Sequence, residues 1–101
     1  LPFMDNLIKQ KKLKNNIFAF YLADLLNYGE FSSIIFGRVE RKRMKSKFLY
    51  ANVSSESYWE IEIDDIFIGG VRTNYCDQLK AETGKCGVAI DSGTSLYAAP
   101  N

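Results

Sequence analysis

Apolar and acidic residues alternate strictly over residues 59–64, Trp-Glu-Ile-Glu-Ile-Asp. Because successive side chains of a strand point to opposite faces, this alternation predicts a strand with Trp59 and the two Ile residues on one face. The parity breaks at Asp64-Asp65, where we expect a bulge or bend. Gly69-Gly70 then separates two short apolar runs and predicts a β-hairpin, since its tight turn needs positive φ angles.

Three further runs, rich in aromatic or β-branched residues, predict strands at residues 17–22, 33–37 and 47–53. We expect a turn at residues 27–29, after the first run, and another at residues 54–57, after the third.

One segment predicts a helix instead, near residues 4–13. Asp5 or Asn6 is a cap candidate at its start, and Lys residues occupy its last turn, as the helix dipole favours. One helix among seven or so short strands indicates a mainly β, antiparallel fold.

The length of 101 residues suits one small domain or part of one. Apolar residues make up 47% of the chain, so there is material for a core and no signature of disorder. No apolar run approaches the roughly 20 residues that span a bilayer. The chain starts with Leu1-Pro2-Phe3, with neither an initiating Met nor a signal-peptide pattern, and we expect it to be a piece of a longer protein.

The sequence contains no His, which removes several mechanisms at once. A Ser-His-Asp or Cys-His nucleophile cannot be built, and a zinc site would have only Cys76, Cys86 and carboxylates as ligands. We therefore expect neither a metal nor a cofactor, and carboxylate chemistry is what remains.

Charge is divided unevenly along the chain. Residues 1–47 hold ten Lys and Arg against four Asp and Glu, whereas residues 48–101 hold three against eight. The basic run 38–47, alone or with Lys9 to Lys14, could bind nucleic acid or acidic lipid. The interpretation we favour is a solvated connection between strands, without a nucleic-acid partner, because no aromatic residue is interleaved with the cations.

Two features near the C-terminal end carry candidate chemistry. Nine residues separate Cys76 from Cys86, and two thiols alone make a poor metal site, which leaves a disulfide or a pair of free buried Cys. An apolar run at residues 87–90 then delivers Asp91 into a Ser-Gly turn, where Ser92, Gly93 and Thr94 offer hydrogen-bond donors to its carboxylate. For an isolated Asp-x-Gly, an ordinary turn would be the better interpretation.

The residues around Asp91 make an ordinary turn the weaker interpretation. Two apolar residues followed by Asp-Ser-Gly-Thr-Ser-Leu, after a Cys-loop-Cys, closely resemble the second catalytic motif of the pepsin-like aspartic endopeptidases. Four upstream segments resemble landmarks of the same family in the same order, at residues 3–7, 17–22, 34–37 and 58–61. Together they cover nearly the whole chain.

The chain also departs from the family pattern. Arg38 stands where a second Gly is usual, Glu40 replaces the usual Asp, and a strongly basic run follows at residues 41–47. The loop between the two Cys residues is longer than in relatives with a tight one. These departures leave Asp91 untouched.

The resemblance implies a partial pepsin-like domain over residues 1–101. It would comprise mostly the C-terminal lobe of a bilobal acid protease, with part of the interlobe region and with further chain at both ends. It implies that Asp91 is the second catalytic Asp, that Ser92 braces the active-site loops and that Thr94 hydrogen-bonds the carboxylate. Gly93, Thr94 and Ser95 resemble positions that contact a peptide substrate, and Cys76–Cys86 is expected to be a disulfide.

The other half of such a site is not in the sequence. No second Asp-Thr-Gly or Asp-Ser-Gly occurs, and the first catalytic Asp would come from a missing N-terminal lobe. We therefore expect an aspartic endopeptidase whose 101-residue fragment is inactive alone and prone to aggregate through open strand edges. A pepsin-like protein that binds peptides without cleaving them is the alternative. The disulfide and the family setting favour the secretory pathway, with an extracellular or acidic vacuolar, lysosome-like destination.

Overall fold

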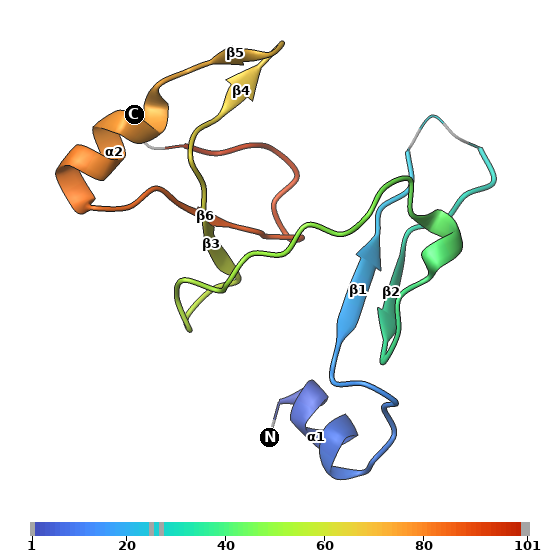
Figure 1. Ribbon diagram of the computed structural model, residues 1–101. Coiled ribbons are helices and arrows are strands. Elements are labelled where there is room, and N and C mark those ends of the chain that lie inside the picture. The colour runs from blue at the N-terminus through green and yellow to red at the C-terminus, as the bar shows by residue number, and fades with distance from the viewer. Residues whose placement is uncertain (1, 25, 27, 100–101) are drawn as a thin grey trace. The chain divides into compact units, whose positions relative to one another are not determined.

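The computed structural model describes residues 2–24, 26 and 28–99 (Figure 1). It divides the chain into two compact units, Leu1–Lys47 and Phe48–Asn101. The division falls where the sign of the charge changes, so the first unit carries a net charge of +6 and the second a net charge of −5. In the described part of the chain, no helix is long and apolar enough to cross a membrane.

The fold is mainly β, as expected, and its strands form two-stranded antiparallel sheets. β1 pairs with β2, β3 with β6, and β4 with β5. The elements are, in order, α1 (Phe3–Lys9), β1 (Phe18–Tyr21), β2 (Ser33–Phe36), the 3-10 helix η1 (Arg41–Arg43), β3 (Glu60–Glu62), β4 (Phe67–Ile68), β5 (Val71–Arg72), α2 (Tyr75–Thr83) and β6 (Gly87–Ala89).

The helix α1 is shorter than the expected 4–13. It starts one residue earlier, with Pro2 at the N-cap, so that Asp5 lies in the first turn instead of capping it. It ends at Lys9 because Lys11 adopts a left-handed conformation with φ of 53°. The N–H of Lys12 then donates to the Leu7 carbonyl at 3.1 Å, the bond that closes a Schellman turn.

A tertiary contact accompanies this early ending. The chain turns back so that Leu13 lies against Gly37, where an added Cβ would meet Leu13 Cδ2 at 3.5 Å. Asn15 also donates its side-chain N–H to the Gly37 carbonyl at 3.1 Å. Leu13, the last residue of the expected helix, therefore packs on the β1–β2 hairpin instead.

The strands β1 and β2 confirm the predictions for residues 17–22 and 33–37. Their register places Phe18 opposite Phe36, and the Phe3 ring of α1 packs edge-on against Phe36 at 5.2 Å between centroids. Gly29, with φ of 104°, lies in the connection between the strands. The expected turn also includes Asn27, which lies outside the described residues.

The strand expected at residues 47–53 is absent from the structure. Phe48 and Tyr50 do lie next to each other, with ring centroids 6.1 Å apart, but no strand pairs with this segment within the described residues. An apolar run becomes a strand only when its N–H and C=O groups find a partner. Pairing begins at Ser54, whose N–H donates to the Glu60 carbonyl at 2.7 Å. The turn predicted at 54–57 lies two residues later, at 56–59, between the paired Ser55 and Glu60.

The alternating segment 59–64 forms β3 in its middle only. Ile61 and Ile63 are half-buried, but Trp59 precedes the strand and is 60% exposed. The predicted break in parity appears as a bend at Asp64. The predicted Gly-Gly hairpin is confirmed as β4–β5, and both glycines have positive φ, 59° and 80°.

The segment between the two Cys residues is a helix, α2, where the sequence suggested a loop. Gly84 ends it in the left-handed conformation and donates its N–H to the Lys80 carbonyl at 2.9 Å. Among the described residues, Cys76 and Cys86 are the buried apolar side chains, at 0% and 2% exposure.

Candidate active site

Asp91 lies directly after the strand pair β3–β6. Val88 pairs with Ile61, and the ladder continues one residue past β6, where the Ile90 N–H donates to the Trp59 carbonyl at 2.9 Å. The chain then leaves the strand and turns at Ser92-Gly93. The backbone pairing up to Ile90 therefore fixes the start of the turn that carries the carboxylate.

Both carboxylate oxygens of Asp91 accept hydrogen bonds from its own turn. The Gly93 N–H donates to Oδ1 at 2.9 Å, and the Thr94 hydroxyl donates to Oδ2 at 2.6 Å. These hydrogen bonds hold the pKa of Asp91 below its usual value. The Thr94 hydroxyl has the larger effect and the Gly93 N–H the smaller one. Asp91 is exposed, so the turn presents an ionised, oriented carboxylate to the solvent.

Because Gly93 has no side chain, the Asp91 carboxylate can lie close to the backbone of this turn. A Cβ at this position would lie 3.2 Å from Asp91 Oδ1, tighter than an ordinary contact. A side chain there would push the carboxylate away from the Gly93 N–H.

The structure brings three of the five predicted site residues together, namely Asp91, Gly93 and Thr94. Ser92 and Ser95 are exposed, and neither makes a side-chain hydrogen bond to another residue that the structure describes. Their hydroxyls are therefore free to contact groups outside this chain segment.

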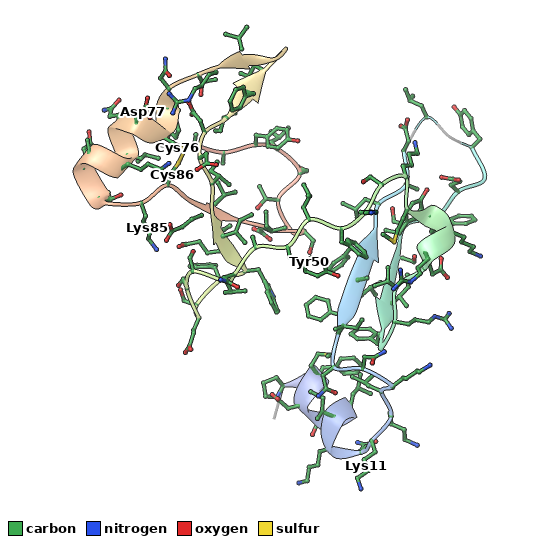
Figure 2. The ribbon with its side chains drawn as sticks, viewed as in Figure 1. Lys11, Tyr50, Cys76, Asp77, Lys85 and Cys86 are labelled. Carbon is green, nitrogen blue, oxygen red and sulfur yellow. A yellow bond between two sulfur atoms is a disulfide. The ribbon has the colours of Figure 1, made fainter. Side chains whose placement is uncertain are left out.

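The predicted disulfide is confirmed. Cys76 and Cys86 are joined, with their Cα atoms 5.3 Å apart, and Figure 2 shows the bond between α2 and the segment that leads into β6. The Cys86 carbonyl also accepts the Ile63 N–H at 3.0 Å. The disulfide thus ties the first turn of α2 to the strand pair that carries Asp91.

A second attachment point of the same strand pair is Glu60. Its Oε1 accepts hydrogen bonds from Lys85 Nζ at 2.6 Å and from the Ser54 hydroxyl at 2.9 Å. These two donors, Lys85 first, hold the pKa of Glu60 below its usual value. Gly87 leaves room for this carboxylate, since a Cβ there would lie 2.9 Å from Oε1.

Asp65, which no motif in the sequence singled out, has a fully buried side chain. Its carboxylate accepts hydrogen bonds or an ion pair from five donors, which are the N–H groups of Ile66, Asn74 and Cys76, the Thr73 hydroxyl and the Arg72 guanidinium. Burial by itself would raise the pKa of Asp65, but the hydrogen bonds outweigh this effect and lower it.

Arg72 links this buried carboxylate to α2. Its Nε lies 3.0 Å from Asp65 Oδ2, while its two terminal nitrogens bind both oxygens of Asp77 at 3.0 and 2.8 Å. The hairpin β4–β5, α2 and the disulfide are therefore held by one polar cluster. No local signal in the sequence indicated this role, since four of the donors to Asp65 come from residues 72–76.

The comparisons with known proteins agree with this arrangement. The model of the family described as "Eukaryotic aspartyl protease" matches residues 1–101. Cathepsin D of Chionodraco hamatus is 35% identical over 99% of this chain and 24% of its own length. Aspartic proteinase A1 of Arabidopsis thaliana is 35% identical over 98% of the chain and 18% of its own length.

Phytepsin of Hordeum vulgare is similar to the chain to a comparable degree, with 32% identity over 99% of the chain and 18% of its own length. The chain thus spans between 18% and 24% of the length of these curated relatives. The match of the family model over all 101 residues decides the assignment: the chain belongs to the eukaryotic aspartyl protease family.

Proposed function

We propose that the protein containing this chain is an aspartic endopeptidase in which Asp91 is one of two carboxylates that activate a water molecule. The observation that carries the proposal is the geometry of the Asp91 turn. A carboxylate at the end of a paired strand, held through both oxygens by Gly93 and Thr94, has a fixed direction and leaves its remaining lone pairs for water.

The chemistry follows from two carboxylates sharing one proton. The donors to Asp91 stabilise its charged form, whereas a second carboxylate nearby would disfavour a second negative charge, so the pair would titrate as a unit. One carboxylate takes a proton from the water while the other polarises the scissile carbonyl. The water oxygen attacks the carbonyl carbon and gives a tetrahedral intermediate without a covalent enzyme adduct.

The roles of the neighbouring residues are part of the same proposal. The Thr94 hydroxyl positions Asp91, and the exposed Ser92 hydroxyl is available to brace a second active-site loop. Gly93, Thr94 and Ser95 would contact the backbone of a peptide substrate. The second Asp and the rest of the substrate cleft would come from a part of the protein outside these 101 residues.

This division of the site implies that the 101-residue chain is inactive by itself. We expect no cleavage of denatured haemoglobin or casein by the isolated chain at acidic pH. The full-length protein is expected to cleave both, and Asp91→Ala should abolish that activity. Glu56→Gln is a matched control, because Glu56 is an exposed carboxylate in the turn before β3.

Two results would contradict the proposal. Cleavage by the isolated chain that disappears in Asp91→Ala would show that a second Asp is not required. A full-length protein that binds peptides but does not cleave them would identify a non-catalytic relative of the family.

The disulfide supports a proposal about the compartment as well. Disulfides form and persist in oxidising compartments, so we place the protein in the secretory pathway, with an extracellular or acidic vacuolar destination. Immunolocalisation of the full-length protein with compartment markers tests this, and a cytosolic distribution would contradict it.

A further inference from the structure

The connection between β1 and β2 carries large apolar side chains in open solvent. Leu22 is 72% exposed, Tyr28 99% and Phe31 82%. The two ends of this connection are held together, because the Ala23 N–H donates to the Ser32 hydroxyl at 3.0 Å. Leu22, Tyr28 and Phe31 therefore belong to the connection between β1 and β2, at the end of the hairpin where Tyr21 and Ser33 pair. Figure 1 shows this end of β1 and β2.

The short helix η1 is anchored at the same end of the hairpin. The Arg43 guanidinium lies over the Tyr21 ring at 4.0 Å from its centroid, and Arg43 Nε pairs with Glu40 at 2.6 Å. The Tyr21 hydroxyl in turn donates to Glu30 of the loop at 2.5 Å. Tyr21 thus connects η1 to the loop, and Figure 1 shows η1 beside the hairpin.

Three cations of this region have no acidic partner among the residues that the structure describes. Arg41, Lys42 and Lys45 are exposed, and none of them forms an ion pair with a residue that the structure describes. The neighbouring acids already accept other bonds, since Glu30 binds Tyr21 and Glu40 binds Arg43. The positive charge of the region therefore remains available to an external anion.

This arrangement alters the interpretation of the basic run. The sequence alone favours a solvated connection, because no aromatic residue is interleaved with the cations. The fold supplies the aromatics from another segment, through the contact of Arg43 with Tyr21.

We propose that this end of the hairpin docks on an anionic membrane surface. Tyr28, Phe31 and Leu22 would enter the boundary between headgroups and acyl chains, and Arg41, Lys42 and Lys45 would bind the lipid headgroups. A soluble polyanion would use the cations but gain nothing from an exposed apolar loop, so the combination favours a lipid surface. The inference is independent of the proposed catalytic role.

The test is co-sedimentation of the full-length protein with vesicles of phosphatidylcholine, with and without phosphatidylserine. Binding is expected only with phosphatidylserine and is expected to weaken as NaCl increases, because the Debye length falls from about 10 Å at 0.1 M to about 3 Å at 1 M. A variant with Arg41→Gln, Lys42→Gln and Lys45→Gln should bind on the order of a hundredfold more weakly, since each cation near an anionic leaflet contributes about fivefold.

A second variant, Tyr28→Ser with Phe31→Ser, tests the apolar loop and should also lose most of the binding. Two controls should bind like the parent protein. Lys42→Arg with Lys45→Arg keeps the charge, and Phe67→Ser with Ile68→Ser removes a pair of exposed apolar side chains on the other unit, 59% and 71% exposed.

The outcomes separate the possible partners. Loss of binding in both test variants, with both controls intact, supports the proposal. Absence of binding, or binding that the loop variant leaves unchanged, would overturn it. Retention on a heparin column without vesicle binding would also overturn it and would assign the cations to a soluble polyanion.

Discussion

Arg72 Nε lies 3.0 Å from Oδ2 of Asp65, whose side chain is entirely buried. This ion pair joins the end of the β4–β5 hairpin to a carboxylate that also accepts the Cys76 N–H. Asp65 therefore organises the structure around the disulfide, and it does so from a position with no catalytic motif of its own.

Replacement of Asp65 by Asn should destabilise the chain. The amide keeps the shape of the carboxylate but turns one acceptor into a donor. In place of Oδ1 this donor faces the N–H groups of Ile66 and Cys76, and in place of Oδ2 it faces the Asn74 N–H and Arg72 Nε. We expect the melting temperature of the full-length protein to fall by several degrees in calorimetry. Asp64→Asn is the neighbouring control, because Asp64 is exposed, and an equal effect of both substitutions would contradict the assigned role.

The same carboxylate makes stability depend on acidity. The pKa of Asp65 is lower in the folded chain than its usual value, so its stabilising contribution is complete above the usual pKa and is lost as the pH falls toward the lower value. Urea unfolding curves should shift to lower midpoints below about pH 4. In Asp65→Asn this part of the pH dependence should be missing.

Loss of the disulfide should cost a large part of the stability of the second unit. Cys76 and Cys86 are the buried apolar side chains among its described residues, and their link closes a short loop around α2. The Cys76→Ser, Cys86→Ser double variant should lose about 2–4 kcal/mol of unfolding free energy, measured in urea. The same loss is expected when the disulfide of the parent protein is reduced. Equal urea midpoints for the oxidised and the reduced protein would contradict this prediction.

Thr94→Val should raise the pKa of Asp91. Valine keeps the shape of threonine but removes the hydroxyl that is the main cause of the lowered pKa. Carboxyl carbon NMR shifts followed against pH measure this directly. Ser95→Ala is the matched control, since Ser95 does not bind the carboxylate within the described structure, and a rise of equal size there would show that the effect is not specific.

Gly37→Ala should destabilise the first unit by about 1–2 kcal/mol, because φ of 81° places an L-residue in the left-handed region. The added Cβ would also meet the Lys14 nitrogen at 3.4 Å and Leu13 Cδ2 at 3.5 Å. Gly29→Ala has a positive φ but open space, so it isolates the backbone contribution. If the two variants unfold at the same urea concentration, the packing of Leu13 on Gly37 contributes little.

Local chemistry explains what could be predicted from the sequence. The β1 and β2 strands and the Gly-Gly hairpin follow from residue types whose preferences act within a few positions. The Asp91 turn is equally local, because its donors lie two and three residues further along the chain. The order of the motifs was then enough to indicate the family, which the family model confirmed.

Contacts between distant segments decided the rest. The packing of Leu13 on Gly37 accompanies the early end of α1, and residues 47–53 form no strand because no described strand pairs with them. The environment of Asp65 and the contact of Arg43 with Tyr21 arise only when separate segments meet. The sequence by itself determined the turns, the strand propensities and the hydrogen-bonded Asp91 turn, because these depend on neighbouring residues. Burial and charge pairing were decided by the tertiary structure, because they depend on which segments the fold brings together.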